Sequence, residues 1–218
     1  KQIGLAIIQY ANDYDEATVP RSSAQGKAWT QTLQPYVKNQ NVFQCPSNPR
    51  KDQPQYSDDG STVGFTSYAA NYHGGIRDVS TSDPVVLLAA YVAPASTINI
   101  VESTAHYSNF NIDYPPLWAV DYTTGNLATG GSYGPGQDPG CLFSGHTGFS
   151  NFLFADGHVK SMRPLATLNT VDGGTNSDNL WRFDNDSFTH AQSINGGPAE
   201  PSPTRAQVSL AWSEKLYK

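Results

Sequence analysis

The sequence has little charge, few basic residues and no long apolar run. Only 15% of its 218 residues are charged, and 13 Lys and Arg face 19 Asp and Glu, which gives a net charge of −6. Nucleic-acid binding needs basic side chains that replace counterions on the phosphates, so the scattered basic residues argue against a nucleic-acid partner. No stretch approaches the ~20 apolar residues that span a bilayer, and we expect no signal peptide within the printed residues. The printed residues therefore do not predict membrane insertion by themselves.

Cysteine is also scarce, with only Cys45 and Cys141, far apart in the sequence. They form no Cys-x-x-Cys pair, so a zinc site with closely spaced soft ligands is not indicated. A catalytic cysteine needs a base, and the sequence offers only His146, five residues after Cys141. We favour a disulfide between the two cysteines, worth about 2–5 kcal/mol in an oxidising compartment. Two buried free thiols are the main alternative, and a catalytic thiol is the least favoured interpretation.

Residues 1–16 predict a helix that is apolar on more than one side. Its large apolar positions include Ile3, Leu5, Ile7, Ile8 and Tyr14. The first, third and fifth of these share one helical stripe, whereas Leu5 and Ile8 lie off it. A short helix of this kind is expected to be buried on several sides, by its own domain and by a neighbour. We interpret it as the C-terminal half of a longer helix.

Further along, the pattern mixes short helices with strands. Residues 28–37 predict an amphipathic helix, and 96–102 a strand with Ile98 and Ile100 on one face. The apolar run 85–92 fits either a strand or a helix. Asp156-Gly157 stands between two β-rich runs and predicts a hairpin with a two-residue type I′ turn.

The other segments are richer in loop-forming residues. Residues 106–140 are rich in Tyr, Gly, Pro and Asn, and a loop this long is usually functional or mobile. Its aromatic side chains either stack against a sugar or a partner protein, or hold the loop to the domain. Residues 193–218 indicate a Pro/Ser/Gly-rich linker and tail ending in a short helix or strand. The predicted parts are therefore 1–16, 17–192 and 193–218.

One acidic loop has the composition of a calcium site. Its candidate ligands are Asp172, Asn176, Asp178, Asp184 and Asp186. Calcium takes six to eight oxygen ligands, and a Gly-containing loop with carboxylates and amides supplies that type of donor. It is not an EF-hand, since the Glu at position twelve and the flanking helices are missing. The alternative is a solvated acidic loop in which Asp and Asn form turns.

His146 and Asp156 are the residues that most invite a catalytic interpretation. If the chain brought them together, a hydrogen bond would fix the imidazole tautomer. The nearby Ser144 and Ser150 do not stand in a Gly-x-Ser-x-Gly elbow, however. We therefore prefer a structural role, with Asp156 in the turn and His146 fixing the preceding loop, and we do not predict an enzyme.

Several stretches, in order, resemble bacterial type IV pilins and type II secretion pseudopilins. They are residues 1–6 (Lys-Gln-Ile-Gly-Leu-Ala), 35–37 (Pro-Tyr-Val), 42–47 (Val-Phe-Gln-Cys-Pro-Ser) and 67–72 (Ser-Tyr-Ala-Ala-Asn-Tyr). The most specific is His146, nine intervening residues, then Asp156 and Gly157. It resembles the His-x9-Asp-Gly signature of one prepilin-type group.

This resemblance implies an α+β pilin-like head, in which an N-terminal helix packs on an antiparallel sheet with long loops. It implies a structural subunit of an extracellular type IV pilus-like or pseudopilus-like filament, with other pilin or pseudopilin subunits as partners. The subunit would be anchored in the inner membrane before assembly, through a helix segment that the printed sequence lacks. The resemblance also favours calcium as a cofactor. The alternative is a cell-surface module that binds carbohydrate or protein through residues 106–140.

Overall fold

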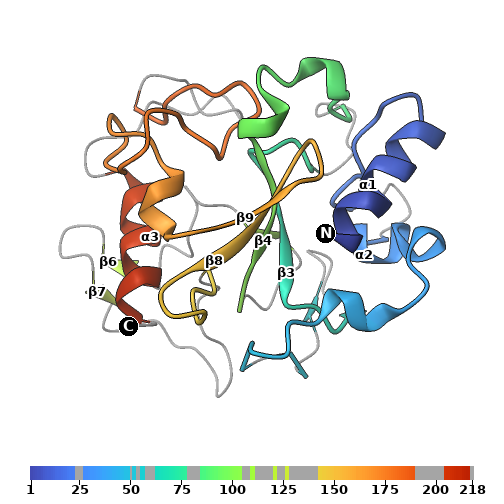
Figure 1. Ribbon diagram of the computed structural model, residues 1–218, viewed down its shortest axis with the longest axis horizontal. Coiled ribbons are helices and arrows are strands. Elements are labelled where there is room, and N and C mark those ends of the chain that lie inside the picture. Colours follow the sequence, from blue (N-terminus) through green and yellow to red (C-terminus); the bar gives the residue numbers. More distant parts are fainter. Residues whose placement is uncertain are drawn as a thin grey trace.

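The computed structural model shows a main β-sheet with a helix on each side (Figure 1). The structure describes residues 1–22, 27–49, 51–52, 55–56, 62–77, 84–104, 109–110, 120–121, 126–127, 142–189 and 204–216. The helices are α1 (Gln2–Asp13), α2 (Trp29–Thr32) and α3 (Arg205–Leu216). Short 3₁₀ helices are η1 (Gln34–Tyr36), η2 (Gln40–Phe43), η3 (Leu88–Ala90), η4 (Pro94–Ser96) and η5 (Pro164–Thr167). Among these described residues, no helix is both long enough and apolar enough to cross a bilayer.

The main sheet has four antiparallel strands in the order β3-β4-β8-β9, with β5 parallel to β3 at one edge. Their bounds are β3 (Tyr68–Asn71), β4 (Ile98–Glu102), β5 (Asn109–Phe110), β8 (Ser150–Phe154) and β9 (Val159–Met162). Two separate two-stranded ribbons pair β1 (Gln55–Tyr56) with β2 (Thr62–Gly64), and β6 (Val120–Asp121) with β7 (Asn126–Leu127). The predicted α+β class is confirmed.

Helix α1 covers one face of this sheet. Ile3, Ile7 and Tyr10 are buried and belong to one cluster with Ile100 and Leu153 from the central strands. The predicted helix over 1–16 is therefore confirmed, with Asp13 as its last helical residue. Its apolar stripe is buried against the sheet of its own domain.

Helix α3 covers the opposite face. Ala206 and Leu210 are fully buried in a cluster with Phe152 and Trp181. The short helix that we expect at the end of residues 193–218 is confirmed as α3, and it packs into the core. Sequence composition pointed to a linker because the preceding residues are rich in Pro, Ser and Gly.

Strand β4 lies between these two layers, and all five of its residues are buried. A bulge between Ile98 and Ile100 interrupts its pairing with β8. The extra residue turns Ile98 toward the α3 side, where Val101 also lies, and leaves Ile100 on the α1 side. The predicted strand is confirmed, but its simple alternation is wrong.

The predicted hairpin is confirmed as β8 and β9, although its turn differs. Phe154 N bonds to His158 O at 2.9 Å, so three residues, 155–157, connect the strands. Of these three residues, only Gly157 has a positive φ, +86°. The type I′ requirement of two positive φ values is instead met just before β8, at Thr147 (56°) and Gly148 (83°).

Candidate functional site

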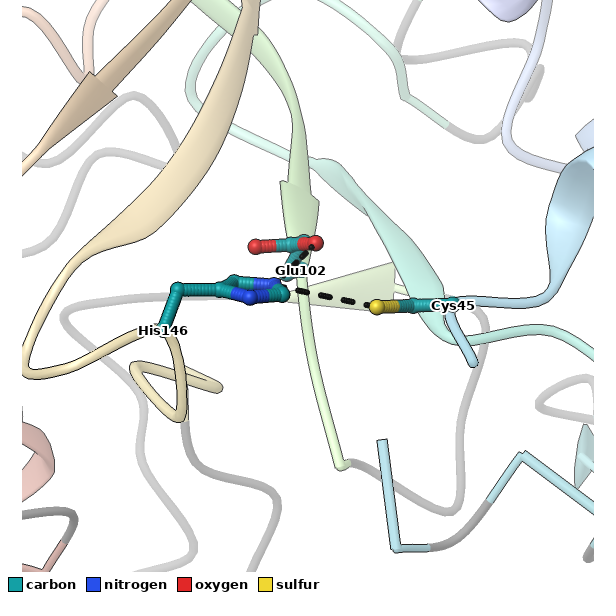
Figure 2. A group of neighbouring side chains, drawn as sticks. All are labelled: Cys45, Glu102 and His146. Atoms are coloured by element: carbon teal, nitrogen blue, oxygen red, sulfur yellow. Dashed lines mark hydrogen bonds and ion pairs between the residues drawn. The ribbon is translucent and has the colours of Figure 1, made fainter. Parts of the chain in front are cut away.

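Cys45, Glu102 and His146 meet beside the end of the central strand β4 (Figure 2). One donor atom from each lies within 4.8 Å of the other two. His146 Nε2 is 3.1 Å from Glu102 Oε1 and 3.7 Å from Cys45 Sγ. This is the one group of three or more His, Cys, Asp or Glu donors with such spacing among the described residues.

The loop that follows η2 holds Cys45. Phe43 is buried edge-to-face against Trp29, with ring centroids 5.6 Å apart, and fixes the start of this loop. Asn48 N then bonds to Cys45 O at 3.0 Å and closes a turn. Asn48 Nδ2 donates to Ser103 O at 2.9 Å, which attaches the turn to the chain just after Glu102. The sulfur is therefore placed by contacts to both α2 and β4.

Glu102 is the last residue of β4, and only 1% of it is exposed. Its Oε2 accepts a hydrogen bond from Asn151 N at 2.8 Å, and its Oε1 faces His146. Asn151 Nδ2 also approaches Oε1, at 3.3 Å. Sequence reasoning missed Glu102, because a single Glu at the end of an apolar strand has no local pattern that marks it.

The tight turn before β8 carries His146. Phe149 N bonds to His146 O at 3.2 Å, across Thr147 and Gly148. The Phe143 ring meets the imidazole edge-to-face, with centroids 5.5 Å apart. Phe143 N in turn donates to Glu102 O at 2.9 Å, so the turn is attached to the strand that carries the carboxylate.

The three side chains do not have the arrangement of a cysteine nucleophile. In such a triad one imidazole nitrogen takes the thiol proton while the other is held by the orienting acid. Here sulfur and carboxylate both face Nε2. Burial raises the pKa of the Cys45 thiol, backbone N–H groups of Ser47 and Asn48 oppose the rise, and the charge of Glu102 adds to it. A thiol with a raised pKa is a poor nucleophile at neutral pH.

Cys45 is a free thiol in this structure, so the predicted disulfide is not formed at this residue. Its sulfur faces His146 instead. Cys141, the expected partner, lies outside the described residues.

His146 and Asp156 are not brought together, which corrects the idea of a direct pair. Strand β8 lies between them: His146 precedes it and Asp156 follows it. Asp156 Oδ1 pairs with His158 Nδ1 at 2.6 Å and also accepts from His158 N at 3.1 Å. Asp156 thus belongs to the turn, as expected for a structural role. Gly157 supplies the positive φ of this turn.

The predicted calcium ligands bond to neighbouring protein groups. No three carboxylates of Asp172, Asp178, Asp184 and Asp186 come together in the described residues. Asp184 forms an ion pair with Arg182, at 2.6 Å. Asn176 Oδ1 and Asp186 Oδ1 accept hydrogen bonds from the backbone N–H of the residue that follows each of them.

Asp172 has a structural role that accounts for its burial. Its carboxylate accepts hydrogen bonds from Asn179 Nδ2 (3.3 Å), Ser187 Oγ (2.6 Å), Phe188 N (2.9 Å) and Thr189 N (3.0 Å). Its backbone O accepts from Thr204 Oγ1 at 2.6 Å, one residue before α3. These contacts connect the acidic loop to Thr204 at the start of α3. The hydrogen bonds to the carboxylate also occupy the lone pairs that calcium would need.

The predicted assembly residues of α1 divide into two groups. Ile3 and Ile7 are buried against the sheet, and Ile8 is half-buried. Leu5 and Tyr14 are 55% and 54% exposed. Within the aromatic loop 106–140, the structure describes only the backbone of the two-residue strands β5, β6 and β7. The predicted binding role of this loop therefore lies outside the described residues.

Searches against protein families, curated proteins and solved structures find no match to this chain.

Proposed function

We propose that this chain is the head of a structural subunit in an extracellular type IV pilus-like or pseudopilus-like filament. The observation that carries the proposal is the outward face of α1. The inward face already packs on the sheet of its own domain, yet the outward face has the character of a contact surface.

Charge is nearly absent from this helix. Among residues 2–13 the sole charged side chain is Asp13, at the end of α1. Its outward positions include the exposed Gln2, Leu5, Gln9 and Asn12. A helix that faces water on one side normally places charged side chains there. An uncharged face with an exposed Leu favours packing against another helix.

Grooves flank the amino-terminal half of α1. One, of about 350 Å³, lies along Leu5, Ala6 and Gln9 and is closed on its far side by Val37 and Val42. The other, of about 380 Å³, lies between Ile3 and the sheet residues Tyr68, Ile100 and Leu153. Packed helices place side chains of one helix into hollows of the next. Two partly apolar grooves beside an exposed Leu supply such hollows for a neighbouring subunit.

Site-specific photo-crosslinking tests this role directly. A photoreactive amino acid replaces Leu5 in the complete gene product, in the bacterium that makes it. We expect a ladder of covalent subunit multiples after irradiation, because Leu5 faces another copy. The control is the same amino acid at Val92, which is apolar and 71% exposed but is not part of α1. Absence of subunit multiples at position 5, or equal yields at both positions, would contradict the proposal.

A further inference from the structure

Three chemically different donor atoms point at one small volume at the end of β4 (Figure 2). They are a thiol sulfur, a carboxylate oxygen and an imidazole nitrogen, and they come from three separate parts of the chain. The Cys45–His146 contact joins residues 101 positions apart, and the Glu102–His146 contact joins residues 44 apart. The fold thus assembles this set from parts that the sequence keeps separate.

We propose that Cys45 Sγ, Glu102 Oε1 and His146 Nε2 bind a zinc-type divalent transition-metal ion, with a fourth position for water or a further ligand. Zinc sites combine these three donor types, and three protein ligands with an open fourth position are a common arrangement. The proposed metal site does not depend on the proposed role in a filament.

The donor separations suit tetrahedral coordination. Zinc lies ~2.3 Å from sulfur and ~2.0–2.2 Å from nitrogen or oxygen, so a tetrahedral angle places N and S roughly 3.6 Å apart and N and O roughly 3.4 Å apart. The observed separations are 3.7 Å for Nε2–Sγ and 3.1 Å for Nε2–Oε1. Shifts of a few tenths of an ångström would therefore match both separations from Nε2, and the sulfur and the carboxylate oxygen lie within 4.8 Å of each other.

The donor types select the class of metal. One carboxylate beside sulfur and imidazole is a poor site for calcium, which takes six to eight oxygens. Thiolate and imidazole are instead preferred by zinc and the later first-row metals. The proposed ion is therefore different from the calcium expected from sequence, and its ligands are different residues.

Neighbouring groups hold the ligands in place. Asn151 donates to both oxygens of Glu102, at 2.8 and 3.3 Å, and the Phe143 ring packs against the imidazole of His146. Such contacts orient the ligands and raise affinity. The buried Glu102 carboxylate has His146 as an ion-pair partner, which is cationic only when protonated. A divalent ion compensates both this carboxylate and a thiolate, and buried charges are stable when paired or bound to metal.

Cobalt spectroscopy tests the site on the unmodified chain. The protein is reduced, stripped with EDTA and titrated with Co²⁺, then with Zn²⁺ in competition. We expect one ion per chain, visible bands typical of tetrahedral Co²⁺, and a thiolate-to-cobalt absorption that zinc removes. Absence of the thiolate absorption would overturn the proposal without any variant.

Substitutions then identify the ligands. C45S removes the thiolate absorption, whereas C141S retains it. E102Q and H146Q weaken zinc binding at least about tenfold. The matched control is H158Q, which breaks the other histidine–carboxylate pair, His158 Nδ1 to Asp156 Oδ1 at 2.6 Å, and leaves binding unchanged.

Two results would contradict the assignment. One is a thiolate absorption that depends on Cys141 rather than Cys45. The other is a Cys45–Cys141 disulfide, found by non-reducing peptide mapping of protein from its producing cells, because it would consume the sulfur ligand. Melting curves in EDTA for each variant separate loss of the ligand from loss of the fold. A variant with weak zinc binding supports the proposal when its metal-free melting temperature equals that of the parent.

Discussion

Gly4 of α1 lies directly against Gly157 of the β8–β9 turn. A Cβ atom at Gly4 would lie 3.1 Å from the carbonyl oxygen of Gly157 and 3.3 Å from its Cα. A Cβ at Gly157 would in turn meet Ile8 Cδ1 at 2.6 Å. The N-terminal helix therefore sits on the turn because neither residue has a side chain. This contact connects two stretches that carry the pilin resemblance.

Replacing Gly4 with Ala should destabilise the domain, although Ala is the better helix former. Alanine gains about 1 kcal/mol of helix propensity over glycine. Displacing the helix from backbone atoms of the turn costs about 1–3 kcal/mol, so we expect a net loss of up to about 2 kcal/mol. Urea unfolding measures it. The control is N12A on the exposed face of the same helix, which should be neutral or slightly stabilising. If G4A were as stable as N12A, the close contact would not exist in solution.

Asp172→Asn should be strongly destabilising. The Asn side chain has only one acceptor oxygen. Its NH₂ group would face N–H or O–H donors that at present bond to the second carboxylate oxygen. Buried donors left without partners cost about 1–3 kcal/mol each, so we expect a loss of about 2–4 kcal/mol. D178N, in an exposed turn of the same loop, should change stability by less than about 0.5 kcal/mol. Equal effects of the two substitutions would show that Asp172 is not an anchor.

Calcium removal should leave the melting temperature unchanged. No three of the predicted carboxylates come together in the described residues, and the Asp172 carboxylate accepts hydrogen bonds from protein donors. For protein already stripped of transition metals, we therefore expect the same thermal midpoint in excess EGTA and in millimolar calcium. A rise in the midpoint with calcium would restore the sequence-based prediction, since ligands that bind only the folded state stabilise it.

Asp184 and Arg182 should contribute stability that depends on pH. Burial alone would raise the pKa of Asp184, but hydrogen bonds from Arg182 and from Asp186 N outweigh it and leave the pKa lowered. A carboxyl with a lowered folded-state pKa contributes stability above its unfolded value of about 4, and loses it as the pH falls through the folded value. D184N should thus cost about 1–2 kcal/mol at pH 7, a modest value because the carboxyl is partly exposed.

The pH dependence separates this pair from a surface contact. The stability difference between the parent and D184N should shrink when unfolding is measured at pH 3 instead of pH 7. D52N removes one partner of the exposed Lys51–Asp52 pair, at 2.8 Å, and should give a small difference at both pH values. A D184N difference that is the same at pH 7 and pH 3 would contradict the assigned ion pair.

Local patterns in the sequence were sufficient for α1 and the β8–β9 hairpin, whereas the α+β class was expected from the pilin resemblance. Each depends on residues close together in the chain, such as the helical spacing of Ile3 and Ile7. The bulge in β4 was not predictable, because it depends on pairing with β8. The burial of α3 likewise depends on a distant sheet face.

The candidate site was predicted only in part, because the sequence indicated a disulfide for Cys45 and a loop-fixing role for His146. Cys45 and His146 stood out individually, but Glu102 did not, and the cluster forms through contacts between distant segments. The spacing argument against zinc applies to ligands that are neighbours in sequence. It has no force for ligands that the fold brings together.

The central claim, a filament subunit, is tested most directly by immunogold electron microscopy with an antibody against this head. The bacterium expresses the complete gene product, with a strain that lacks the gene as the control. We predict gold label along thin surface filaments that disappear in the deletion strain. An exported protein that labels the surface without filaments, or filaments that persist unlabelled after deletion, would contradict the claim.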